Sequence, residues 1–211
     1  MTRGAAARAP GAALGVELPV MDFHEPKPAF FFDRDDTLVR DGGYMSRPEQ
    51  IVPLPGAASA LAAARRAGCR LYLVTNQSGI GRGYYAMADA EACNRRLEEL
   101  LGVVFDGICI APEAPGEPSR YRKPSPAYIL ERIAADGLAK DRCAMIGDKV
   151  SDLQCGERAG VRAALVARVS TGEPRPDAAA YAAGRSIPAF SSVSEAVAAL
   201  LREFSSGPMG E

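Results

Sequence analysis

Short apolar runs along this chain alternate with longer segments in which apolar and polar residues follow a helical period. Strands are expected at the apolar runs, which cover residues 29–32, 70–74, 107–110, 143–146 and 162–166. Helices are expected at the amphipathic, Ala-rich segments, residues 57–67, 87–101, 126–135, 151–159 and 194–204. Four of these helices run into glycine, which adopts positive φ easily and closes a helix, at Gly68, Gly102, Gly137 and Gly160. This alternation predicts an α/β fold, a parallel sheet with helices on both faces.

The length and the limits of the pattern predict one domain. A chain of 211 residues suits a single α/β domain, which we place at residues 29–204. Residues 1–28 lack periodicity and are expected to form a flexible arm, and residues 205–211 a flexible tail. His24, the single histidine, lies in that arm among prolines, so we interpret it as a surface residue and not as a catalyst.

The charge balance and the cysteines exclude several classes of function. Lys and Arg total 25 against 26 Asp and Glu, a net charge of −1, so we expect neither a nucleic-acid partner nor a membrane partner. No apolar stretch approaches the ~20 residues that span a bilayer. The five cysteines are scattered singly, which predicts reduced thiols, no disulfide bonds and a cytoplasmic location. We expect a monomer.

Two carboxylates follow the first apolar run. Asp33 and Asp35 alternate directly after Phe32, and side chains two residues apart in extended backbone project to the same side. The carboxyl edge of a parallel sheet is where open α/β proteins place their sites. There, one aspartate can attack an electrophile while the other handles a proton, with a divalent cation screening their repulsion. Asp-x-Asp alone, however, is better explained by an acidic turn.

Three later segments bring further polar groups to the same predicted edge. The second strand ends in Thr75-Asn76-Gln77-Ser78 and then a Gly-rich turn around Arg82, a composition that suits a phosphate. Arg122 and Lys123 precede a proline, which makes Lys123 a candidate phosphate clamp. Taken alone, the first segment also reads as a polar turn that caps the next helix, and the second as solvated cations.

The fourth strand is followed by Gly147-Asp148-Lys149, with Asp152 four residues after Asp148. Mg²⁺ prefers oxygen ligands from one or two carboxylates. Asp33 and Asp148 would supply them, and Asp152 would orient a water or Lys149 from outside the ligand set. Asp152 or Ser151 can equally be the N-cap of the next helix.

Taken together in this order, the four segments resemble the signature of the haloacid dehalogenase-like phosphohydrolases. Within this superfamily, the sequence resembles the D-glycero-D-manno-heptose 1,7-bisphosphate phosphatases and the related histidinol-phosphate phosphatases. The similarity is carried by Asp33-Arg34-Asp35, Thr75 to Ile80, Arg122-Lys123-Pro124 and Gly147-Asp148-Lys149. The resemblance covers roughly residues 29–166. It implies a Rossmann-like domain with a minimal cap or none, Mg²⁺ dependence, and a small phosphorylated metabolite as substrate.

The resemblance also implies roles for individual residues. Asp33 would be the nucleophile that forms an aspartyl-phosphate, and Asp35 the general acid and base, with Thr75 and Lys123 around the phosphoryl oxygens. Mg²⁺ would be held by Asp33, Asp148 and the Asp35 carbonyl oxygen. The substrate would contact Asp41, Gly42, Gly43, Tyr44, Asn76, Gln77, Ser78, Arg122 and Lys149. Arg82 is added to these contacts from the composition of the Gly-rich turn, where it can form a charge-assisted hydrogen bond. Tyr84 and Tyr85 are as often packing residues and are not assigned to the site.

Two departures from the family pattern affect these expectations. Asp36 stands where family members usually carry glycine, so it must either tolerate an unusual backbone conformation or add negative charge beside the site. Many relatives hold a structural zinc after the third strand. Residues 109–123 here contain one cysteine and no histidine, so we expect no structural zinc and a loop stiffened by the prolines between 112 and 118.

Removal of the 7-phosphate from D-glycero-D-manno-heptose 1,7-bisphosphate is the activity that the resemblance favours. Histidinol-phosphate phosphatase, or a phosphatase for another small metabolite, is the alternative enzyme. The alternative without catalysis is a phosphate-binding regulatory domain impaired by Asp36.

Overall fold

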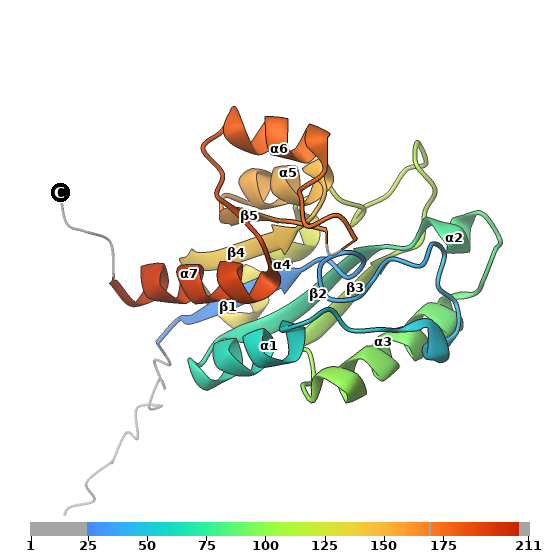
Figure 1. Ribbon diagram of the computed structural model, residues 1–211, viewed down its shortest axis with the longest axis horizontal. Helices are drawn as coiled ribbons and strands as arrows, with labels where there is room; N and C mark the ends of the chain where they lie inside the picture. The colour runs from blue at the N-terminus through green and yellow to red at the C-terminus, as the bar shows by residue number, and fades with distance from the viewer. Residues whose placement is uncertain (1–24, 169, 207–211) are drawn as a thin grey trace, which may run out of the picture.

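The computed structural model describes residues 25–168 and 170–206, which form one sheet and its covering helices (Figure 1). The strands are β1 Lys27–Phe32, β2 Arg70–Asn76, β3 Gly107–Ala111, β4 Leu138–Gly147, β5 Arg162–Val166 and β6 Ala189–Phe190. The helices are the 3-10 turn η1 Pro48–Gln50, then α1 Ala57–Arg66, α2 Ser78–Gly81, α3 Met87–Leu101, α4 Ala127–Asp136, α5 Val150–Ala159, α6 Pro176–Ala183 and α7 Val193–Ser206. The predicted arm up to His24 lies outside the described residues.

The sheet is parallel, as the alternation of strands and helices predicts. Its strand order is β3-β2-β1-β4-β5-β6, and every described neighbouring pair is parallel. β1 therefore lies between β2 and β4, so the residues that follow these three strands emerge side by side at one edge.

The three phenylalanines of β1 show how both faces of the sheet are covered. Phe30 and Phe32 point to one face and pack with residues of α1, α3 and α7, whereas Phe31 points to the other face, towards α4 and α5. All three side chains are fully buried. Figure 1 shows α1 and α3 side by side along the lower part of the sheet, and α6 stacked above α5. A strand covered on both faces needs apolar residues at successive positions, which is why β1 lacks alternation.

The predicted elements are confirmed, with differences at their ends. The sheet extends beyond the apolar runs because Lys27 pairs with Leu138, so β1 and β4 both begin earlier than expected. Lys27 and Pro28 therefore belong to the domain and not to the arm. Ser205 and Ser206, assigned to the tail, end α7. The four glycines after the helices all have positive φ, as predicted.

Apart from the short helical segments η1 and α2, two elements were not predicted at all. Helix α6 has the sequence PDAAAYAA, whose alanines carry too little contrast between polar and apolar faces to indicate a helix. Strand β6 has two residues and pairs only through Leu165 and Val166 of β5. Together they extend the sheet beyond β5 and carry the chain back towards α7.

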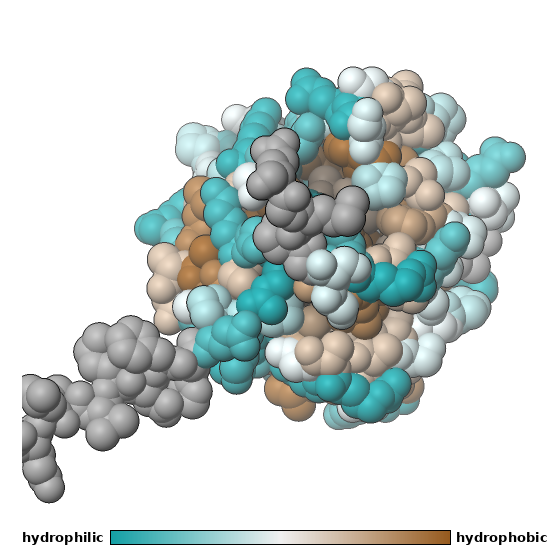
Figure 2. All heavy atoms as spheres, turned by 90° about the vertical axis from the view of Figure 1, so that its left-hand side faces the viewer, coloured by the Kyte–Doolittle hydropathy of each residue, from teal (hydrophilic) through white to brown (hydrophobic). Residues whose placement is uncertain are grey.

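The surface and the thiols are those of an ordinary folded domain. The face in Figure 2 intersperses hydrophilic residues with small hydrophobic areas, which is typical of exposed protein surface. All five cysteines are buried thiols without a disulfide bond. Among the described residues, no helix has the length and apolar character needed to cross a membrane. The cytoplasmic location and the monomeric state stay predictions.

Asp106, in the loop before β3, ties the lower end of the sheet to α1. Its carboxylate accepts hydrogen bonds from Arg65 and Arg70, both at 2.5 Å, and from the Leu71 N–H at 2.8 Å. Burial raises the pKa of Asp106, but these three hydrogen bonds more than offset it and hold the pKa below its ordinary value.

We expect Asp106→Asn to lower the free energy of unfolding at pH 7 by about 1–2 kcal/mol. Most of this loss comes from the Leu71 N–H, which loses a charged acceptor; Arg65 and Arg70 contribute less because both are partly exposed. A carboxyl group whose pKa is lowered by folding stabilises the fold above its unfolded pKa of ~3.9, and this stabilisation is lost as the pH falls through the folded pKa. Urea unfolding of both proteins at pH 7 and below pH 3 measures this. A difference that persists undiminished in acid would contradict the assignment.

Candidate active site

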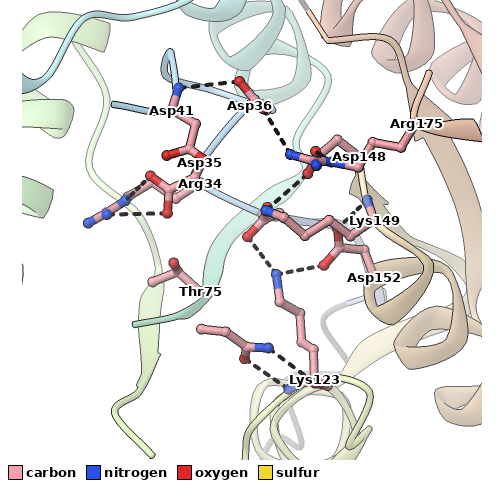
Figure 3. Close-up of polar contacts among 12 residues, drawn as sticks. Arg34, Asp35, Asp36, Asp41, Thr75, Lys123, Asp148, Lys149, Asp152 and Arg175 are labelled. Carbon is pink, nitrogen blue, oxygen red and sulfur yellow. Dashed lines mark hydrogen bonds and ion pairs between the residues drawn. The ribbon is translucent and has the colours of Figure 1, made fainter. Parts of the chain in front are cut away.

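The carboxyl edge of β2, β1 and β4 gathers the acidic residues predicted for the site (Figure 3). Asp33 follows β1, and its N–H donates to the Ile146 carbonyl oxygen of β4 at 2.9 Å. Thr75 lies near the end of β2, and Asp148 directly follows β4. All three side chains are buried. The strand order therefore brings Asp33 together with Thr75, 42 positions later in the sequence, and with Asp148, 115 positions later.

A buried ammonium group joins two of these carboxylates. Lys123 Nζ lies 2.6 Å from Asp33 Oδ1 and 2.7 Å from Asp152 Oδ1, and each of the three side chains is at most 4% exposed. Asn76 fixes the backbone of Lys123: its amide nitrogen donates to the Lys123 carbonyl oxygen at 3.1 Å, and its amide oxygen accepts from the Lys123 N–H at 3.0 Å. Asn76, predicted to contact substrate, is thus engaged in holding the loop that carries Lys123.

Asp152 reaches Lys123 because residue 147 has no side chain. A Cβ atom at Gly147 would lie 2.3 Å from Asp152 Oδ2 and 2.5 Å from its Cβ. The same Oδ2 accepts a hydrogen bond from the Lys149 N–H at 3.0 Å at the start of α5. The N-cap of α5 is therefore Lys149, and neither Ser151 nor Asp152 as predicted; Asp152 is the third residue of the helix and accepts the N–H of the N-cap while it also binds Lys123. Its role in orienting a water or the Lys149 side chain stays a prediction.

The cations determine which groups are charged. Burial raises the pKa of Asp33, but Lys123 and Lys149 more than compensate and lower it to about 2. Burial lowers the pKa of Lys123, while Asp152 and Asp33 raise it, with a net increase. At neutral pH, Asp33 is therefore a carboxylate and Lys123 an ammonium ion, the states that a nucleophile and a phosphate clamp require.

Asp148 and Asp152 are crowded by like charge. Burial raises the pKa of Asp148 to about 6, and the neighbouring carboxylates of Asp33 and Asp152 add to this, against Lys149 and Arg175. The pKa of Asp152 is raised for the same main reason. Carboxylate oxygens of Asp33, Asp148 and Asp152 all lie within 4.8 Å of one another. Such crowding of buried acids is relieved by a cation.

The side chain of Asp35 forms hydrogen bonds with residues other than Lys123 and Asp152. Arg34, which is 1% exposed, contacts both carboxylate oxygens of Asp35 at 3.1 and 3.3 Å. Arg34 is held in turn by Asn94 of α3 at 3.2 Å. Gln77 Nε2 donates to Asp35 Oδ2 at 2.9 Å and to Thr75 Oγ1 at 2.7 Å. The sequence analysis assigned no role to the side chain of Arg34 or of Asn94; the acidic neighbours of Arg34 are the only local signal of its ion pair with Asp35.

Asp36 does both of the things that the sequence left open. Its φ is 59°, in the left-handed region that favours glycine. Its carboxylate also lies beside the site, where Oδ2 accepts from Arg175 Nη2 at 3.1 Å and Oδ1 from the Asp41 N–H at 3.3 Å. Arg175 Nε donates to Asp148 Oδ2 at 2.5 Å. Arg175 precedes α6, the helix that the sequence did not predict, and was missed with it.

An open, polar cavity of about 280 Å³ lies above Asp35. It is lined by Arg34, Asp35, Asp41, Gly43, Tyr44, Met45, Asn76, Gln77, Ser78, Tyr85 and Lys149. Seven of the ten predicted substrate contacts line it; Gly42, Arg82 and Arg122 do not. Arg122 instead donates to the Glu113 carbonyl oxygen at 2.7 Å, and burial together with nearby Arg82 lowers its pKa. The substrate roles of all ten stay predictions.

The Gly-rich turn after β2 serves packing. A Cβ atom at Gly79 would lie 2.2 Å from the ring of Tyr85, whose hydroxyl donates to Gln77 Oε1 at 2.7 Å. At Gly81, a Cβ atom would lie 2.8 Å from the Pro112 carbonyl oxygen, which accepts the Gly81 N–H. The glycines thus admit Tyr85 and the loop after β3. Tyr85 belongs to the cavity wall, a position that sequence reasoning did not assign.

Hydrogen bonds within the loop after β3 hold it in place. Glu117 Oε2 accepts from the Ala114 N–H at 2.6 Å, in addition to the contact of Arg122 with Glu113. Beyond the loop, Arg120 and Tyr121 both donate to Glu131 of α4. The expectation that no structural zinc is present stays a prediction.

This chain is similar in sequence to known proteins. The D-glycero-D-manno-heptose-1,7-bisphosphate 7-phosphatase of Chlorobaculum tepidum is 40% identical over 158 residues, which cover 67% of this chain and 79% of that protein. The D-glycero-beta-D-manno-heptose-1,7-bisphosphate 7-phosphatase of Helicobacter pylori strain 26695 is 39% identical over 138 residues, covering 64% and 80%.

The fold is also found in a solved structure. The D,D-heptose 1,7-bisphosphate phosphatase of B. bronchiseptica, crystallised with magnesium and phosphate, superimposes with a TM-score of 0.70 at 24% identity over 83% of this chain and 99% of that one. A family model for haloacid dehalogenase-like hydrolases matches residues 34–160, which include Asp35, Thr75, Lys123 and Asp148. With three fifths of its residues matched and relatives near 40% identity, this chain belongs to the haloacid dehalogenase-like hydrolases.

Proposed function

We propose that this protein is a Mg²⁺-dependent phosphatase that removes the 7-phosphate of D-glycero-D-manno-heptose 1,7-bisphosphate. The observation that carries the proposal is the anionic Asp33, buried beside the Lys123 ammonium at 2.6 Å and beside Asp148. The substrate is supported by the names of the relatives that are about 40% identical. The polar cavity suits a hydroxyl-rich sugar phosphate, because its wall offers both hydrogen-bond donors and acceptors.

The chain's own residues supply the chemistry. Asp33 attacks phosphorus, so that an aspartyl-phosphate forms as the bond to the sugar oxygen breaks, and Asp35 gives its proton to that oxygen. Asp35 then takes a proton from the water that hydrolyses the aspartyl-phosphate. Covalent capture divides one slow hydrolysis into two easier steps. Thr75 accepts a hydrogen bond from Gln77, which leaves its own hydroxyl proton to donate to a phosphoryl oxygen.

The residues present fit a magnesium ion. Asp33 Oδ2 and Asp148 Oδ1 are buried and receive no hydrogen bond. Lys149 Nζ lies 3.6 Å from the first and 3.3 Å from the second, so both oxygens already face a cation, and a metal ion bound there would replace this ammonium group as their partner. Hard oxygen donors of this kind, on one or two carboxylates, suit Mg²⁺. The Asp35 carbonyl oxygen is proposed as the third protein ligand. Bound there, Mg²⁺ would offset the negative charge of the phosphoryl group.

Hydrolysis of a substrate panel tests the function. With Mg²⁺, we expect kcat/KM for heptose 1,7-bisphosphate to exceed that for histidinol phosphate by at least about 100-fold, because binding groups placed for sugar hydroxyls are left unpaired by the other substrate. The product should be heptose 1-phosphate, and excess EDTA should abolish the reaction. Assays with both anomers identify the preferred one. Faster hydrolysis of histidinol phosphate would establish the alternative enzyme, and no hydrolysis of 4-nitrophenyl phosphate would favour the regulatory domain.

Asp33→Asn tests the nucleophile. This change keeps the size of the side chain but removes the attacking anion, so we expect kcat to fall at least about 1,000-fold with little change in the circular dichroism spectrum. Asp141→Asn, an exposed position in β4, is the matched control and should retain full activity. Residual activity above a tenth of the original would refute the assignment.

Gly147→Ala tests the space that Asp152 needs. The added methyl group would displace the Asp152 carboxylate and with it Lys123, so we expect kcat/KM to fall at least about tenfold and stability by about 1–3 kcal/mol. Gly184→Ala is the control, because its Cβ atom would meet nothing closer than 3.6 Å and its φ is −67°. Equal activity of the two variants would show that the position of Asp152 is not critical.

A further inference from the structure

Arg175 is a cation that neither the sequence motifs nor the proposed chemistry uses. It is the residue before α6, and its side chain is 28% exposed. Its guanidinium spans two carboxylates: Nε donates to Asp148 Oδ2 at 2.5 Å, and Nη2 donates to Asp36 Oδ2 at 3.1 Å (Figure 3). Asp36 and Arg175 are 139 positions apart in the sequence, so the contact depends on the fold and not on a local turn.

Asp36 is held so that its carboxylate meets Arg175. Its N–H donates to the Val39 carbonyl oxygen at 2.8 Å, and its Oδ1 accepts from the Asp41 N–H. A positive φ is unfavourable for a residue with a side chain and persists only where the surroundings enforce it. The backbone and both carboxylate oxygens of Asp36 are therefore fixed at the rim of the site.

The charges of Arg175 and Asp36 have opposite effects on the binding of a cation at Asp148. Arg175 contacts Oδ2 of Asp148, while Oδ1 is buried, receives no hydrogen bond and lies 3.3 Å from Lys149 Nζ. The guanidinium of Arg175, bound to Asp148 Oδ2, repels a divalent cation near Asp148, and the negative charge of Asp36 attracts it. As a pair, they add no net charge to the site. Alone, either one would change its potential.

We propose that Asp36 and Arg175 form a charge-neutral pair that tunes the affinity of the acidic cluster for Mg²⁺. Arg175 weakens cation binding at Asp148, Asp36 strengthens it, and their mutual contact keeps both side chains in place. This inference rests on the proposed Mg²⁺ site of the phosphatase.

Direct Mg²⁺ titration by calorimetry, without substrate and at constant pH and ionic strength, tests the pair. We expect Arg175→Met to bind Mg²⁺ roughly three- to tenfold more tightly, and Asp36→Asn to bind it more weakly by a similar factor. Asparagine tolerates positive φ, so the backbone is retained. The double variant should bind within about twofold of the original protein. Asp36→Gly is the second variant at this position if Asp36→Asn does not fold.

Thermal unfolding of the same proteins without Mg²⁺ measures what the contact contributes to stability, and the opposite shifts in Mg²⁺ affinity are the readout that a purely structural role would not give. Each single change should lower Tm, because it removes or weakens the charged hydrogen bond between residues 36 and 175, and the double change should lower Tm by less than the sum of the two single changes. Arg185→Met is the matched control: it removes an arginine that lies just after the end of α6 and contacts Glu157, and it should leave Mg²⁺ affinity unchanged.

The outcomes distinguish the inference from the function on which it rests. Opposite shifts in Mg²⁺ affinity for the two single variants support the pair. Shifts in the same direction, or Mg²⁺ affinities equal to that of the original protein, overturn it while leaving the magnesium site intact. Failure of the original protein to bind Mg²⁺ overturns the proposed metal site and the inference together.

Discussion

The placement of a buried ammonium group between Asp33 and Asp152 is the constraint on which the rest of the site depends. Removing three charges from water is costly, and the cost is offset only where partners lie within hydrogen-bond distance. Lys123 meets both carboxylates at 2.6 and 2.7 Å. This requires the end of β1, the loop before α4 and the start of α5 to be fixed together. The parallel strand order fixes two of them, and Asn76 fixes the third through the backbone of Lys123.

The same crowding explains why the acids of the site behave differently. Asp33 has the close ammonium group, so its pKa falls to about 2, whereas the pKa of Asp148 rises to about 6 because burial and neighbouring carboxylates outweigh Lys149 and Arg175. One aspartate is therefore ready to act as an anion, and the other gains most from a bound cation. A strongly acidic edge balanced by Lys123, Lys149, Arg34 and Arg175 can thus hold a metal ion and a phosphate in the same place.

Much of the fold was predictable, because apolar runs and helical periods record which residues are buried. Both ends of helix α3 and of strand β5 were predicted to the residue. Helix α6 consists mostly of alanine, so its sequence shows no helical period of polar and apolar residues. The acidic residues at the strand ends were predictable for the same reason, since a buried strand fixes where the next side chain emerges. Asn94 and Arg175 were not, because their partners Arg34 and Asp36 lie 60 and 139 positions away in the sequence and nothing local indicates the contact. For Asp36, the sequence posed the right alternatives, and only the three-dimensional arrangement shows that both apply.

The contact between Gly81 and Pro112 joins two loops that border the cavity. The Gly81 N–H donates to the Pro112 carbonyl oxygen at 2.9 Å, and no side chain fits between them. Asn76 connects the same two regions again through Lys123. The loop after β2 and the loop after β3 are therefore coupled at the mouth of the cavity. A longer or differently shaped segment after β3 would displace both Ser78 in the cavity wall and Lys123. Engineering this scaffold towards a larger phosphate ester would require compensating changes on both loops at once.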